Sequence, residues 1–102
     1  MGKYSVALLA PAAAELEAIG RKHLMLVGPK SAEKVTDKIL ASLERLEQFP
    51  NSGAPTPDPN LNSEGYRMVV SGVYVSVYRL IGDTVNVYHI ADGRTDYSKL
   101  FK

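Results

Sequence analysis

The sequence predicts an α+β fold in which a helical hairpin packs on a small antiparallel sheet, in the order β-α-α-β-β-β. Between Pro11 and Leu46, apolar residues recur at helical spacing, and a single Gly-Pro pair interrupts them. From Gly65 to Ile90 the pattern becomes that of strands, and two tight turns divide the segment into a three-stranded meander. A short alternating pattern near the N-terminus supplies the first strand.

Length and composition restrict the function classes. With 102 residues, we expect one domain spanning residues 1–102. A formal net charge of +1 argues against a protein that coats nucleic acid by bulk electrostatics. The absence of cysteine excludes disulfides, thiolate catalysis and Cys-based zinc sites. His23 and His89 show no metal-ligand spacing, so we expect no metal and no cofactor. No stretch resembles a membrane span, which makes a soluble cytoplasmic protein the expectation.

The first strand and the two helices are predicted from residues 4–46. Alternation over residues 4–8 indicates a strand, and Pro11 opens an alanine-rich helix that ends at Gly28-Pro29. We expect His23, on the apolar stripe of this helix, to be a packed, hydrogen-bonded residue at the edge of the core. Ser31 is a good N-cap for the second helix. The apolar stripe of that helix consists of Val35, Ile39, Leu43 and Leu46. Because the connecting loop is short, the helices should be antiparallel.

Residues 50–65 differ sharply in composition from the rest of the chain. Four prolines alternate there with Asn, Ser, Gly and Asp, so we expect no regular element and a stiff spacer. A loop of this length in a small domain is either functional or a poorly ordered surface segment. We favour the second interpretation.

The meander contains a two-residue hairpin signal, Gly82-Asp83, which places Ile81 opposite Thr84. This register divides the last two strands into two faces. One face carries Val75, Val77, Arg79, Asn86, Tyr88 and Ile90. The other face carries Tyr74, Ser76, Tyr78, Leu80, Val85, Val87 and His89. The first face is the more apolar at its centre, and we expect it to pack on the helices.

A polar segment follows the meander and gathers Arg94, Asp96, Tyr97 and Lys99 within six positions. Such side chains at the end of a sheet form a platform for an anion, in particular a phosphate chain. Alternatively, Asp96 caps a short terminal helix or neutralises Arg94. We favour this structural interpretation, because an Asp beside an Arg more often stabilises than reacts.

Two residues of the meander are further candidates. Arg67 either clamps a phosphate or pairs with Glu64 or Asp96 at the sheet edge. The hairpin register places His89 opposite Ser76, where a histidine can do acid–base work near neutral pH. The alternative for His89 is a half-buried amphipathic patch covered by a partner, and we favour it.

The order of these segments resembles the RelE/ParE superfamily of bacterial toxins, the toxin halves of type II toxin–antitoxin pairs. The resemblance covers nearly the whole chain, including the Ser31-Ala32 helix start, Leu46 and Phe49-Pro50. The segments that match best are Gly65-Tyr66-Arg67, the strand 74–79, the hairpin 82–85, the strand 87–90 and the segment 93–97. RelE-like members cleave messenger RNA in the ribosomal A site, whereas ParE-like members share the fold and poison DNA gyrase.

An ungapped comparison with RelE-like toxins implies which functional positions are kept. Arg67 matches the basic residue of the first meander strand, but the second basic position of that strand holds Val69. The other positions of the RelE-like catalytic set hold Val75, Thr95 and Phe101. The resemblance therefore leaves a variant catalytic site of Arg67, His89, Arg94, Asp96 and Tyr97, with Arg94 and Tyr97 close to the family positions.

We therefore expect a growth-arresting toxin that a cognate antitoxin neutralises by direct binding, in a hetero-oligomer. The open sheet face would suit a strand or helix of the antitoxin. Two targets remain open: DNA gyrase, bound without catalysis, and ribosome-bound messenger RNA, cut by a metal-independent endoribonuclease. The substitutions at Val75 and Thr95 favour gyrase, while Arg67, His89 and Tyr97 favour the ribosome. The alternative to both is a decayed or repurposed binding or regulatory protein without toxicity.

Overall fold

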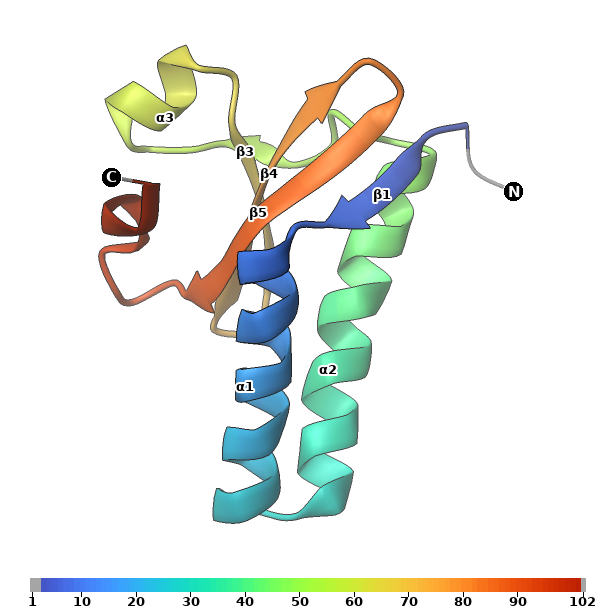
Figure 1. Ribbon diagram of the computed structural model, residues 1–102, viewed down its shortest axis with the longest axis vertical. Coiled ribbons are helices and arrows are strands. Elements are labelled where there is room, and N and C mark those ends of the chain that lie inside the picture. Colours follow the sequence, from blue (N-terminus) through green and yellow to red (C-terminus); the bar gives the residue numbers. More distant parts are fainter. Residues whose placement is uncertain (1–2, 102) are drawn as a thin grey trace.

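The computed structural model describes residues 3–101 and confirms the predicted α+β class (Figure 1). Two helices form an antiparallel hairpin beside a sheet, as predicted. In chain order the elements are β1 (Ser5–Leu8), α1 (Ala10–Leu26), α2 (Pro29–Glu44), η1 (Arg45–Glu47), β2 (Ala54–Pro55), α3 (Pro59–Ser63), β3 (Arg67–Ser71), β4 (Tyr74–Ile81), β5 (Thr84–Asp92) and η2 (Tyr97–Phe101). No helix within residues 3–101 is long and apolar enough to cross a membrane.

The sheet has five strands in the order β1-β5-β4-β3-β2. The predicted meander forms β3, β4 and β5, and Ile81 pairs with Thr84 across a turn in which Gly82 has a φ of 60°. The sheet is not wholly antiparallel, because β1 pairs with β5 in parallel. This pairing reaches only to Val87, although β5 continues to Asp92.

The helical hairpin is longer than the sheet beside it, so its far end projects beyond the strands (Figure 1). α2 begins at Pro29, directly after Gly28 with its φ of 141°, and no side chain caps it. The prediction of Ser31 as the N-cap is therefore wrong, because proline at the first helical position starts the helix three residues earlier, with Gly28 at the N-cap. Inside α2, Ser31 contacts His23, which also bonds the Tyr74 hydroxyl, as expected for a packed core-edge histidine.

The predicted choice of the core-facing side of the sheet is wrong. The face that packs on the helices carries Tyr74, Tyr78, Leu80, Val85 and Val87, and its helical partners include Ile19, Ile39, Leu43 and Leu46. Tyrosines are tolerated in this core because their hydroxyls have hydrogen-bond partners there.

A β-bulge in β5 accounts for a second error in assigning faces. Val77 pairs with His89 and Tyr78 pairs with Val87, so Tyr88 has no counterpart in β4. The extra residue reverses the alternation beyond it. As a result, Ile90 joins the helix-facing core, and His89 lies opposite Val77 rather than the predicted Ser76.

The second face of the sheet is covered by α3 and the C-terminal residues. Leu61, Tyr66, Val75 and Val77 form its buried cluster, and Met68, Tyr88, Tyr97 and Phe101 pack against them. The prediction that the 50–65 segment contains no regular element is therefore wrong. The segment contains β2 and α3, and the Asp58 carboxylate caps α3 by accepting from the N–H groups of Asn60 and Leu61.

Candidate functional site

Arg67, the first residue of β3, holds the proline-rich segment against the sheet. Its Nη1 donates hydrogen bonds to the carbonyl oxygens of Gly53 (2.8 Å) and Asn51 (3.3 Å). These carbonyls are the partners that the structure gives Arg67, in place of the Glu64 and Asp96 carboxylates considered from the sequence. The guanidinium thus fixes a loop at the sheet edge.

His89 forms an ion-pair-type contact that the sequence did not predict. Its Nδ1 lies 3.0 and 3.1 Å from the two carboxylate oxygens of Glu15, on α1. The same carboxylate accepts a 3.0 Å hydrogen bond from the backbone N–H of Ile90. Because β1 ends its pairing at Val87, Glu15 satisfies the edge of β5 where a neighbouring strand is missing. The His89 ring also packs edge-on against Phe101, with centroids 4.8 Å apart.

Arg94 is neutralised by Asp92, and not by Asp96 as the sequence suggested. Its Nε and Nη2 donate to the Asp92 carboxylate at 2.9 and 2.6 Å, and its backbone N–H adds a third bond at 2.9 Å. These hydrogen bonds hold the pKa of the Asp92 carboxyl well below its ordinary value. Asp96 directly precedes η2, and its carboxylate accepts a 2.6 Å bond from the Ser98 hydroxyl.

Tyr97 contributes to packing on the second face of the sheet. Its hydroxyl points at the Met68 sulfur, 3.5 Å away, which is a weak acceptor. Burial raises the pKa of the Tyr97 phenol, and the nearby charge of Asp58 raises it further. A tyrosine whose pKa is raised is less able to act as a base near neutral pH.

The structure does not gather the five candidate residues at one place. Arg67 lies opposite Tyr78 in the ladder, on the face toward the helices. Tyr97 and the Phe101 ring that His89 contacts belong to the cluster on the other face. Arg94 lies in the exposed connection after β5, bound to Asp92. No three His, Cys, Asp or Glu side chains within residues 3–101 are grouped to hold a metal ion.

Sequence reasoning missed a cation enclosed by aromatic rings on the second face. The Arg79 guanidinium lies 4.6 Å from the ring centre of Tyr66 and 5.5 Å from that of Tyr88. Its Nη2 donates to the Tyr88 hydroxyl at 3.1 Å, while its buried Nε has no partner among the described residues. The sequence did contain a signal for this contact, because the predicted hairpin register places Arg79 and Tyr88 on one face. A fixed cation between two aromatic rings stabilises this face by cation–π attraction.

Comparison with known proteins places the chain in a family. A model of the ParE toxin of type II toxin–antitoxin systems matches residues 6–97. The chain belongs to the ParE toxin family. No curated protein matches its sequence at a significant level.

Two solved structures resemble this ParE-family chain. The chromosomal ParDE toxin–antitoxin system from P. aeruginosa has 26% identity and a TM-score of 0.74, covering 88% of this chain and 96% of that one. The RelBE2 toxin–antitoxin complex from Mycobacterium tuberculosis has 19% identity and a TM-score of 0.58, covering 90% and 93%. At that identity, the second match supports the fold alone. The predicted membership of the RelE/ParE superfamily is confirmed.

Proposed function

We propose that this ParE-family protein arrests bacterial growth by binding DNA gyrase in the cytoplasm, without catalysing a reaction itself. The observation that carries the proposal is the dispersal of the candidate catalytic residues. Metal-free RNA cleavage requires a base, an acid and cations around one phosphate. Here Arg67 and Tyr97 belong to opposite faces of the sheet, and Arg94 is bound to Asp92.

An antitoxin partner is part of the proposal, because the family model is that of the toxin of a type II toxin–antitoxin system, and the P. aeruginosa structure is described as a ParDE toxin–antitoxin system. We place its docking surface along the helical hairpin. A groove of about 500 Å³ runs between α1 and α2, lined by Leu8, Ala13, Leu16, Gly20 and Leu24 among others. An amphipathic helix binds such grooves through its apolar face.

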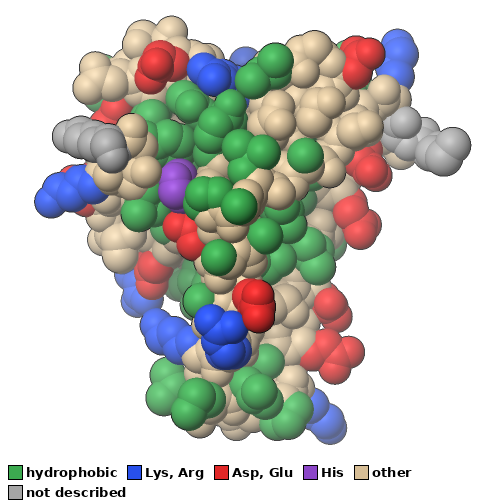
Figure 2. All heavy atoms as spheres, viewed as in Figure 1, with side chains coloured by type: hydrophobic (Ala, Val, Ile, Leu, Met, Phe, Trp, Pro, Cys, Tyr) green, Lys and Arg blue, Asp and Glu red, His purple; other side chains and the backbone are tan. Residues whose placement is uncertain are grey.

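The apolar surface continues from this groove to the end of the hairpin. Leu24, Met25, Leu26 and Val27 are 48%, 85%, 73% and 72% exposed. Figure 2 shows apolar side chains gathered at the projecting end of the molecule. A contiguous exposed apolar patch marks an interaction surface.

The proposed target is tested with the purified protein in two assays run side by side. In the first, DNA gyrase supercoils plasmid DNA in the presence of the protein. In the second, stalled ribosomes carry a defined messenger, and primer extension maps any cuts. We expect inhibition of supercoiling together with intact messenger.

A second candidate function has one observation in its favour. The His89–Glu15 pair is a positioned acid–base group, because a carboxylate that accepts from one imidazole nitrogen fixes the tautomer of the ring. Messenger cuts that disappear in His89→Ala, with gyrase unaffected, would replace the gyrase proposal by ribosome-dependent cleavage. A protein that is inactive in both assays and harmless on expression would be a non-toxic binding or regulatory member of the family.

A further inference from the structure

A small cleft lies between the first half of α2 and the turn joining β3 to β4, and none of the five candidate catalytic residues lines it. Its volume is about 220 Å³. Six polar side chains line it: His23, Ser31, Lys34, Lys38, Ser71 and Tyr74. None of its lining residues is acidic. The cleft is smaller than the roughly 300–1,000 Å³ of sites for drug-sized ligands, so it suits a single chemical group.

A chain of hydrogen bonds forms one wall of this cleft. His23 Nε2 lies 2.9 Å from the Tyr74 hydroxyl, and Nδ1 lies 3.3 Å from the Ser31 hydroxyl. A neutral imidazole donates through one nitrogen and accepts through the other. The two hydrogen bonds therefore use two of the three available hydrogens in either tautomer. One hydroxyl hydrogen, on Ser31 or on Tyr74, is left to donate to a ligand.

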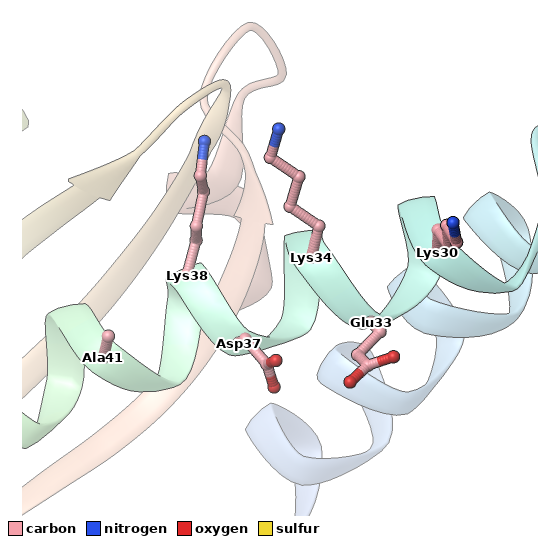
Figure 3. Close-up of a pocket in the computed structure, with 6 residues that line it drawn as sticks. All are labelled: Lys30, Glu33, Lys34, Asp37, Lys38 and Ala41. Carbon is pink, nitrogen blue, oxygen red and sulfur yellow. The ribbon is translucent and has the colours of Figure 1, made fainter.

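Two lysines supply positive charge on the other side of the cleft. Lys34 and Lys38 are four residues apart on α2, so their side chains lie on the same side of the helix. Figure 3 shows both extending from α2 toward the strands, while Glu33 and Asp37 point away from them. Within residues 3–101, neither ammonium forms an ion pair with a carboxylate within 4.0 Å. An anion between them would relieve their mutual repulsion.

The acidic residue adjoining this wall does not oppose an anion. Asp92 pairs with Tyr74 in the β4–β5 ladder. Its carboxylate is held by the Arg94 guanidinium at 2.6 and 2.9 Å, so the pair carries no net charge. Lys34 and Lys38 thus place two positive charges beside a concave, hydroxyl-rich surface that no acidic side chain lines.

We propose that this cleft binds a phosphate group. Lys34 and Lys38 neutralise its charge, and Ser71 and the free hydroxyl of the Tyr74–His23–Ser31 chain donate hydrogen bonds to its oxygens. Charge-assisted hydrogen bonds of this kind are stronger than neutral ones. The proposal is independent of the cellular target, because it rests on the cleft alone.

The test is an NMR titration of the isotopically labelled protein with inorganic phosphate, against sodium chloride at matched ionic strength. We expect saturable shifts at the His23 ring and the Gly72 amide. The double variant Lys34→Gln/Lys38→Gln should weaken binding at least about tenfold, as loss of charged hydrogen bonds predicts. Lys30→Gln is the matched control on the same helix, since Lys30 does not line the cleft, and its effect should stay within about twofold.

Shifts that chloride reproduces, that do not saturate, or that Lys30→Gln weakens as much as the double variant overturn the proposal. Two further ligands then distinguish the source of the phosphate. Adenosine 5′-monophosphate offers a terminal monoester, and a short oligothymidylate with free hydroxyl ends offers only diesters. Tighter binding of the first than of inorganic phosphate identifies a nucleotide-type ligand, and tighter binding of the second identifies a nucleic-acid backbone.

Discussion

The hydroxyl of Tyr78, on β4, joins two backbone groups of the proline-rich segment. It donates a 2.7 Å hydrogen bond to the carbonyl of Pro50 and accepts a 3.0 Å bond from the N–H of Gly53. The Tyr78 side chain is fully buried, and burial raises the pKa of its phenol. One core tyrosine therefore positions a segment that its composition suggests is irregular.

Replacing Tyr78 by phenylalanine should destabilise the protein by about 1–3 kcal/mol, because the Pro50 carbonyl and the Gly53 N–H lose their buried partner. Urea unfolding followed by circular dichroism measures the change. Tyr97→Phe is the matched control, because its hydroxyl meets only the Met68 sulfur at 3.5 Å. Its cost should be about 0.5 kcal/mol or less. Equal costs for the two variants would contradict the assigned role of the Tyr78 hydroxyl.

Gly53 is required by the same arrangement. A Cβ at this position would lie 2.6 Å from the Tyr78 hydroxyl and 2.7 Å from the Met68 carbonyl oxygen. Gly53→Ala should therefore destabilise the protein by about 1–3 kcal/mol through forced displacement of the loop. Thermal unfolding of the variant beside Tyr78→Phe tests this. Because the two substitutions damage one contact, the double variant should lose less stability than the sum of the single losses. If the loss of stability in the double variant equals the sum of the single losses, the two substitutions do not act on one shared contact.

Glu15 should matter more to stability than an exposed glutamate on the same helix. Its carboxylate serves both the His89 ring and the Ile90 N–H at the edge of β5. Glu15→Ala removes both contacts and should cost about 1–3 kcal/mol. Glu17→Ala is the control, because Glu17 pairs with Arg21 on the surface and such pairs contribute about 0.5 kcal/mol or less. If growth arrest comes from binding gyrase, His89→Ala should leave inhibition of gyrase intact.

The helices and the hairpin turn were predictable from the sequence because local signals determine them. Gly82-Asp83 sets its turn, and the stripe from Val35 to Leu46 sets the buried side of α2. The core-facing side of the sheet was not predictable from apolar counts. Tyr78 is acceptable in the core only because a distant loop satisfies its hydroxyl, and the bulge at Tyr88 reverses the alternation without a local signal.

The candidate site shows the same division between local and distant information. The partners of Arg67 and His89 are Gly53 and Glu15, which are 14 and 74 residues away in the sequence. Such pairings arise only when the chain is folded, so no spacing rule finds them. The hairpin register alone places Arg79 and Tyr88 on one face. The contact of the Arg79 guanidinium with the Tyr66 ring depends on where the chain enters β3.

The Asp92–Arg94 pair should make a pH-dependent contribution to stability. The Arg94 hydrogen bonds lower the pKa of Asp92 below its ordinary value of 3.8. A carboxyl whose pKa is lowered by folding stabilises the folded state above its unfolded pKa, and this contribution is lost as the pH falls toward the folded pKa. Asp92→Asn should therefore be destabilising at pH 7, and its difference from the unmodified protein should shrink below about pH 4. Unfolding curves of both proteins at pH 7 and below pH 4 test this. A stability difference that grows in acid would contradict the pairing.

The proposed antitoxin surface can be tested by placing a charge in it. Leu24 lines the α1–α2 groove and is 48% exposed, so Leu24→Glu should fold normally but place a charge in the interface. We expect co-expressed antitoxin to protect cells less well from this variant, because burying an unpaired carboxylate costs several kcal/mol. Ile81→Glu is the matched control, since Ile81 is 51% exposed at the β4–β5 turn, outside the groove. Growth arrest on expression without antitoxin shows that each variant is still toxic. Equal protection from both variants would contradict the proposal that the antitoxin binds the helical hairpin.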